Sequence, residues 1–112
     1  MSAEIEQVTA EEAIAMHDSG VALIDVRESW EFDRGHAPGA VLLPTSQFED
    51  RFGELSRDDT LLIICHAGPR SFDATVALVA AGFHAIDVAG GMVAWRGAGG
   101  PVERDGEPLH NA

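Results

Sequence analysis

The fold of this chain is decided by the segment LLIICHAGPRS, which occupies residues 61–71. Its first four residues form an apolar run that is too short for a helix and predicts a buried strand. A glycine-containing loop follows, and it begins with Cys65, the only cysteine of the chain. We expect Ser71 to cap a helix that follows this loop, because apolar residues recur there at helical spacing until Gly82.

A strand, a tight loop and a helix start place the sulfur of Cys65 over backbone N–H groups that lack partners. Such groups and the helix dipole favour an anion, so we expect this thiol to ionise readily. Gly68 allows a positive φ or a close backbone approach, and Arg70 adds a cation near the loop. The alternative is a purely structural Cys65, since free cysteine is among the most buried residue types. Such a cysteine would need neither Gly68 nor Arg70.

The rest of the sequence alternates between short predicted strands and helices. Further strands are expected at residues 21–24, 41–43 and 85–88, and helices at 9–19, 28–34, 45–52 and from 92 onward. Thr9 and Glu12 have the spacing of a capping box, and Thr45 or Ser46 is the expected cap of the third of these helices. The alternation predicts an α/β fold with a mostly parallel sheet covered by helices on both faces.

Length and composition set the class of protein. The 112 residues, 46% of them hydrophobic, suit one domain over residues 1–112, with a core at about 8–102 and a flexible tail at 103–112. A single cysteine excludes an internal disulfide, and the histidines show no metal-ligand spacing. The acidic net charge of −12 makes nucleic acid and anionic membranes poor partners. Without a signal-peptide or membrane-span pattern, the expected location is the cytoplasm.

Three sequence blocks, in the right order, carry a family resemblance. Cys65, Gly68, Arg70 and Ser71 form a C-x-x-G-x-R-S pattern that resembles the active-site loop of the rhodanese (thiosulfate sulfurtransferase) homology domain. The other blocks, which resemble the first and last signatures of that family, are residues 25–28, 31–32 and 35–40, and residues 90–95 and 99–102. The resemblance implies a rhodanese-like three-layer sandwich around a five-stranded sheet, with no cofactor and no metal.

The resemblance also implies a reaction. A sulfurtransferase would move sulfane sulfur from thiosulfate or a similar small anionic donor to a thiophilic acceptor, cyanide or a thiol, through a persulfide on Cys65. Arg70 would orient the loop or the charged end of the donor. The remaining loop residues are the expected anion-binding group: His66, Ala67, Gly68, Pro69 and Ser71. Supporting roles fall to Asp25 and Arg27, as an ion pair at a strand end, and to His36, as a structural turn contact.

Two alternatives to this enzyme remain. The chain could be a persulfide carrier or binding module that docks on a partner protein, such as a protein sulfur acceptor, without turnover of its own. Less favoured is a phosphatase, because phosphatases of this fold have five residues between cysteine and arginine, and here residues 66–69 supply four. His66 stands where family members often have a basic residue, and Pro69 removes one N–H group from the predicted cradle.

Overall fold

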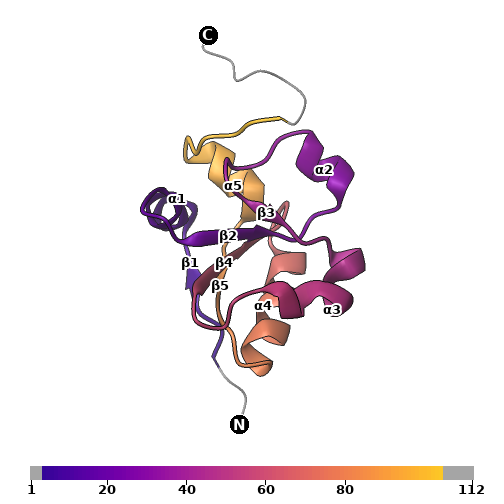
Figure 1. The fold of residues 1–112 in the computed structure, drawn as a ribbon. Helices are drawn as coiled ribbons and strands as arrows, with labels where there is room; N and C mark the ends of the chain where they lie inside the picture. The colour runs from indigo at the N-terminus through magenta and orange to yellow at the C-terminus, as the bar shows by residue number, and fades with distance from the viewer. Residues whose placement is uncertain (1–3, 105–112) are drawn as a thin grey trace.

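The computed structural model describes residues 4–104, which fold around a five-stranded sheet (Figure 1). All neighbouring strands are parallel, in the order β1-β5-β4-β2-β3. The strands are β1 (Gln7–Val8), β2 (Ala22–Asp25), β3 (Val41–Leu42), β4 (Thr60–Ile64) and β5 (His84–Val88). The predicted α/β architecture is therefore confirmed. Sequence patterns had indicated four of these strands, and β1, with only two residues, is too short to show a period.

Within residues 4–104, five α-helices connect or follow the strands. The helices are α1 (Ala10–Asp18), α2 (Ser29–Asp33), α3 (Phe48–Arg51), α4 (Pro69–Ala80) and α5 (Gly91–Gly97). The capping box before α1 is confirmed, because the Glu12 N–H donates to Thr9 Oγ1 and the Thr9 N–H donates to Glu12 Oε1. The prediction that Ser71 caps α4 was wrong. Gly68 holds the cap position with φ +129°, a conformation that glycine adopts without steric cost.

The predicted helix over residues 45–52 was also wrong in its extent. A 3₁₀ turn over Thr45–Gln47 precedes α3, and a second 3₁₀ turn over Phe52–Glu54 follows it. Neither Thr45 nor Ser46 acts as the cap. Instead, the Thr45 hydroxyl donates to the carbonyl of Val26, and the Ser46 N–H and hydroxyl both donate to the Glu28 carboxylate. Side-chain contacts with the β2–α2 connection thus decide where this segment turns.

The sheet separates two apolar cores, and β4 contributes to both. Leu61, Ile63 and Cys65 lie in the core on the side of α3 and α4. The intervening residues Leu62 and Ile64 lie in the core on the other side, which is completed by side chains from α1 and α5. The last helix is anchored by Trp95, which is fully buried there. Alternation along β4 therefore places the cysteine on the α4 side of the sheet.

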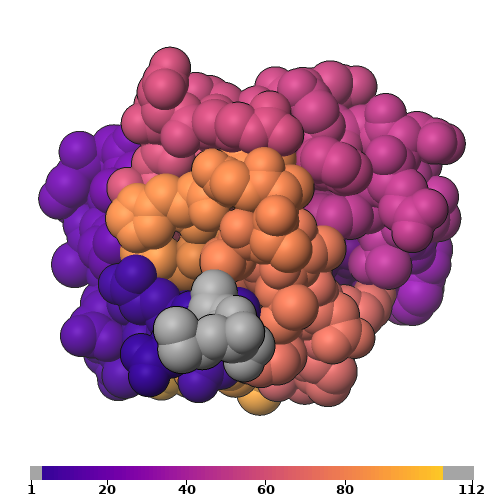
Figure 2. All heavy atoms as spheres, turned by 90° about the horizontal axis from the view of Figure 1, so that it is seen from below, coloured from indigo at the N-terminus to yellow at the C-terminus, as the bar shows by residue number. Residues whose placement is uncertain are grey.

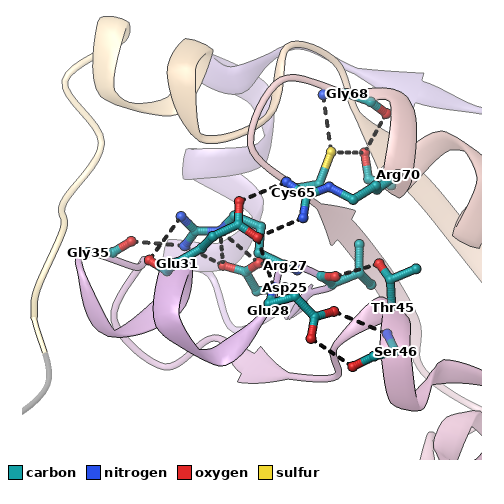
Figure 3. Close-up of polar contacts among 12 residues, drawn as sticks. Asp25, Arg27, Glu28, Glu31, Gly35, Thr45, Ser46, Cys65, Gly68 and Arg70 are labelled. Atoms are coloured by element: carbon teal, nitrogen blue, oxygen red, sulfur yellow. Dashed lines mark hydrogen bonds and ion pairs between the residues drawn. The ribbon is translucent and has the colours of Figure 1, made fainter.

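The two ends of the sheet differ in what they expose. β2 ends at Asp25 and β4 leads into Cys65, so the two residues lie at the same edge of the sheet, and Figure 3 labels both. Figure 2 shows the molecule from below, where the orange segment around the end of α4 and the start of β5 lies between indigo N-terminal residues and the pink and magenta residues before β4.

Glu103, where the tail was predicted to begin, exchanges two backbone hydrogen bonds with His36. Residues 105–112 of that predicted tail lie outside the described residues.

Candidate active site

Cys65 follows β4 directly, and its side chain is buried at the start of α4 (Figure 3). The Gly68 N–H donates to the sulfur at 3.1 Å, and the sulfur lies 3.4 Å from the hydroxyl oxygen of Ser71. Gly68 is the only residue between positions 4 and 104 whose backbone N–H bonds this sulfur. The other loop amides that still carry a proton make no hydrogen bond to another described residue: His66, Ala67, Arg70 and Ser71. They are available to an anion bound at this loop.

Arg70 is held by an acidic partner on α2. Its two terminal nitrogens donate to the two carboxylate oxygens of Glu31, at 2.7 and 2.8 Å (Figure 3). The hydrogen bond from Arg70 is the largest effect on that carboxyl and lowers the pKa of Glu31 to about 2. The pKa of Arg70 is raised, chiefly by Glu31 and to a smaller extent by Cys65 and Asp25. The guanidinium thus remains charged beside the cysteine in a bidentate, rigid geometry.

The Glu31 carboxylate also accepts a hydrogen bond from the Glu28 N–H, at the start of α2. Sequence reasoning placed Glu31 in a family-like block but gave it no role in the site. The sequence showed only that Glu31 lies in a predicted helix after the first strand. It could not show which cation this carboxylate contacts. This ion pair connects α2 to the start of α4, directly after the cysteine loop.

The predicted ion pair at the end of β2 is present and buried. An Arg27 nitrogen lies 2.7 Å from an Asp25 carboxylate oxygen, and the same nitrogen donates to the Gly35 carbonyl at 2.9 Å. His36 stacks on Phe32 with ring centroids 3.7 Å apart. One of its ring nitrogens also lies 2.8 Å from the Phe32 carbonyl oxygen. These contacts hold residues 35 and 36, in the connection after α2, in a fixed position.

The cysteine loop is also fixed by the start of α5. The N–H groups of Met92 and Val93 donate to the carbonyls of Cys65 and His66. This approach requires glycine at position 91, where φ is +56° and a Cβ atom would overlap both carbonyl oxygens. The His66 side chain itself is exposed, at the mouth of the loop. In the sequence, the two consecutive glycines that begin the block at residues 90–95 were the only indication of this close contact.

Behind the loop lies a second acidic residue that sequence reasoning missed. Asp87 on β5 is 1% exposed, and one of its carboxylate oxygens lies 2.6 Å from the Ser71 hydroxyl. The same oxygen atom of Ser71 faces Cys65. A hollow of about 490 Å³ opens on this side of the loop, with Gly68, Pro69 and Asp87 among its lining residues. The only hint in the sequence was a charged residue within an otherwise apolar strand.

Residues 4–104 carry neither a metal-binding cluster nor a membrane-spanning helix. No group of three histidine, cysteine, aspartate or glutamate side chains in this range could hold a metal ion. None of the helices in the same range has the length and apolar character that crossing a membrane requires.

A parallel sheet, with a cysteine and a glycine in the loop between β4 and α4 and an arginine in the first turn of α4, defines the class of protein. The family model described as the rhodanese-like domain matches residues 9–98 of this chain. The chain therefore belongs to the rhodanese-like domain family, as the sequence blocks had indicated. The rhodanese-like fold is also that of a rhodanese-related protein from Thermoplasma volcanium, with a TM-score of 0.82 and 28% identity over 88% of this chain and 97% of that one.

Individual relatives of this chain differ in the roles that their names give them. The thiosulfate sulfurtransferase GlpE of Pseudomonas syringae is 33% identical over 83% of this chain and 89% of its own length. The putative sulfur carrier protein YrkF of Bacillus subtilis is 40% identical over 71% of this chain, which spans only 44% of YrkF. A solved protein from Rhodopseudomonas palustris, described as a possible tyrosine phosphatase, has a TM-score of 0.81 and 32% identity over 88% of this chain and 85% of that one.

Proposed function

We propose that the protein is a sulfurtransferase that takes sulfane sulfur from thiosulfate, or a similar small anionic donor, onto Cys65. The thiolate of Cys65 attacks the outer sulfur of thiosulfate, the S–S bond of the donor breaks, and sulfite leaves with its electron pair. The product is a persulfide whose terminal sulfur carries the negative charge. An acceptor, cyanide or a thiol, then attacks that terminal sulfur and regenerates Cys65.

The observation that carries this proposal is the Gly68 N–H on the sulfur, beside loop amides that have no other described partner. Helix starts bind anions through such N–H groups. We expect these amides, of Ala67, Arg70 and Ser71, to stabilise the negative charge on the terminal sulfur of a persulfide. Arg70, fixed by Glu31, adds a positive charge that attracts the anionic donor to this mouth.

The loop length supports sulfur over phosphate as the transferred group. Four residues separate Cys65 from Arg70, so the ring of amides is smaller than one with five. We expect a phosphoryl group, with its three equatorial oxygens, to be crowded in the smaller ring. We therefore propose a small-molecule sulfur donor as the substrate and a thiol, including a protein thiol, as an acceptor class. The proposed location, which rests on the sequence alone, stays the cytoplasm.

The test is mass spectrometry of the protein after thiosulfate treatment, together with steady-state formation of thiocyanate from thiosulfate and cyanide. We expect an adduct of about 32 Da on Cys65, the mass of one sulfur atom, and continuous turnover. The matched control is Cys65→Ser, which keeps the size of the side chain and removes the sulfur. An adduct without turnover would instead favour the carrier, the role named for YrkF. Hydrolysis of an aryl phosphate without any adduct would favour a phosphatase.

A further inference from the structure

We propose that Asp87 is a positioning residue that acts through the Ser71 hydroxyl to disfavour negative charge on the Cys65 sulfur while it carries no second sulfur. The part of this inference that concerns the loaded state rests on the proposed function, and the part that concerns the free thiol does not. Asp87 has no role in the transfer as described above, yet it is a buried carboxylate two hydrogen bonds from the reacting sulfur.

Both oxygens of the Asp87 carboxylate act as acceptors. The Ser71 hydroxyl donates to one oxygen at 2.6 Å, and the side-chain amide of Gln7, on β1, donates to the other at 2.8 Å. Acceptance at both oxygens is the pattern of an ionised carboxylate. Among the described residues no arginine pairs with Asp87, so its charge is balanced only by neutral dipoles.

The Ser71 hydroxyl has one proton and three neighbours that could accept it. Its oxygen lies 2.6 Å from Asp87, 3.0 Å from the Gly68 carbonyl and 3.4 Å from the Cys65 sulfur. The shortest of these distances is typical of a charge-assisted O–H···O⁻ bond. The Ser71 hydroxyl therefore donates its proton to the hydrogen bond with Asp87. The Ser71 oxygen then presents a lone pair to the sulfur, where it accepts the S–H of a thiol.

A thiolate at the same place loses this partner. Ser71 cannot donate to Asp87 and to the sulfur at once, so ionisation either breaks the 2.6 Å bond or leaves two negative charges with an acceptor between them. A persulfide does not have this cost, because its charge lies on the outer sulfur and Sγ is neutral. Asp87 therefore disfavours charge on Sγ more than charge on the outer sulfur.

The other charged groups around Cys65 act from different elements and are paired. Arg70, at the start of α4, is bound to Glu31 of α2, and Asp25 at the end of β2 is bound to Arg27. His66 is exposed at the mouth, and Asp73 is an exposed residue of α4 that lines the same hollow as Asp87. Arg70 favours the thiolate from the front, and Asp87 opposes it from behind.

The test is a pH titration of the Cys65 thiol in the intact protein, reduced and free of sulfur, by thiolate absorbance and by the rate of alkylation with iodoacetamide. Asp87→Asn keeps an oxygen that accepts from Ser71 and removes the charge. We expect the midpoint of the titration to fall by about one pH unit, with roughly tenfold faster alkylation at about pH 6. Asp73→Asn removes the same charge at the same hollow without touching Ser71, and its midpoint should move by less than a third as much.

A double-mutant cycle tests the route through Ser71. In a Ser71→Ala background, Asp87→Asn should shift the midpoint much less than it does in the natural chain, because the connecting hydroxyl is gone. An unchanged or higher midpoint in Asp87→Asn would overturn the proposal, and an equal shift in both backgrounds would overturn the role of Ser71. If Asp87→Asn does not fold, Gln7→Leu on the exposed edge strand removes a donor from Asp87 and should raise the midpoint instead.

These outcomes are independent of sulfur transfer. The titration uses only the free thiol, so a protein that forms no persulfide can still confirm the coupling between Asp87 and Cys65. Conversely, the protein could form the persulfide adduct while Asp87→Asn leaves the midpoint of the Cys65 titration unchanged. That result would support the sulfurtransferase and exclude the role of Asp87.

Discussion

Two sides of the Cys65 loop differ in charge: the front, where Arg70 lies, and the back, where Asp87 lies. In front, Arg70 and Glu31 form a bidentate pair that is partly open to solvent. Behind, the buried carboxylate of Asp87 has only the neutral Ser71 and Gln7 as hydrogen-bond partners. We expect a positive group at the mouth of the loop, together with a buried carboxylate that has no arginine partner within residues 4–104, to favour negative charge that lies toward the mouth. In a persulfide the charge lies outward, and in a thiolate it does not.

The largest effect should come from breaking the loop that holds both sides in place. Gly91→Ala puts a Cβ against the carbonyls of Cys65 and His66 at a position with φ +56°. We expect the free energy of unfolding to fall by about 2–3 kcal/mol and persulfide formation to be lost. Urea unfolding and mass spectrometry measure the two effects.

The control for this variant is Gly97→Ala, at the end of the same helix, where a Cβ would meet no atom within 4 Å. Its stability should change by about 0.5 kcal/mol or less. Equal losses in the two variants would show that α5 as a whole, and not its contact with the cysteine loop, is sensitive.

A smaller effect should come from the front alone. Arg70→Lys keeps the positive charge and loses the bidentate contact with Glu31. We expect thiosulfate turnover to fall by about tenfold, mainly through kcat/KM, because the donor meets a less well positioned cation. Steady-state kinetics measure this change.

Arg51→Lys is the matched control, since Arg51 also pairs with a glutamate, Glu54, but on the exposed surface of α3. Its turnover should match that of the natural chain. If Arg70→Lys also turns over normally, the front of the site acts only through its backbone amides.

The smallest effect concerns Glu31 and its dependence on pH. Because folding lowers the pKa of this carboxyl from 4.5 to about 2, the ion pair contributes stability fully above about pH 4.5 and loses it as pH falls toward 2. Glu31→Gln should lower the free energy of unfolding by about 1 kcal/mol at neutral pH. Urea unfolding at a series of pH values should show the two proteins converge as the pH approaches 2, and a constant difference would contradict the assignment.

The difference between front and back also separates what a local pattern can predict from what it cannot. Apolar runs and punctuating glycines predicted β2, β3, β4 and β5, and the capping box predicted the start of α1. The cap of α4 was misplaced because Ser71 has the residue type of a cap. Its hydroxyl is used instead by Asp87, 16 residues away. A local propensity was overridden by a contact between distant residues.

The sequence by itself determined the parallel α/β sheet, the position of Cys65 at the end of a central strand, and the nearby glycine and arginine. These features depend on periodicity and on backbone conformation, which are properties of short segments. Only the tertiary structure decided that Arg70 meets Glu31, 39 residues away, and that Ser71 joins Cys65 to Asp87. Both contacts form where separate strands and helices end at one edge of the sheet, and no local pattern records which side chains meet there.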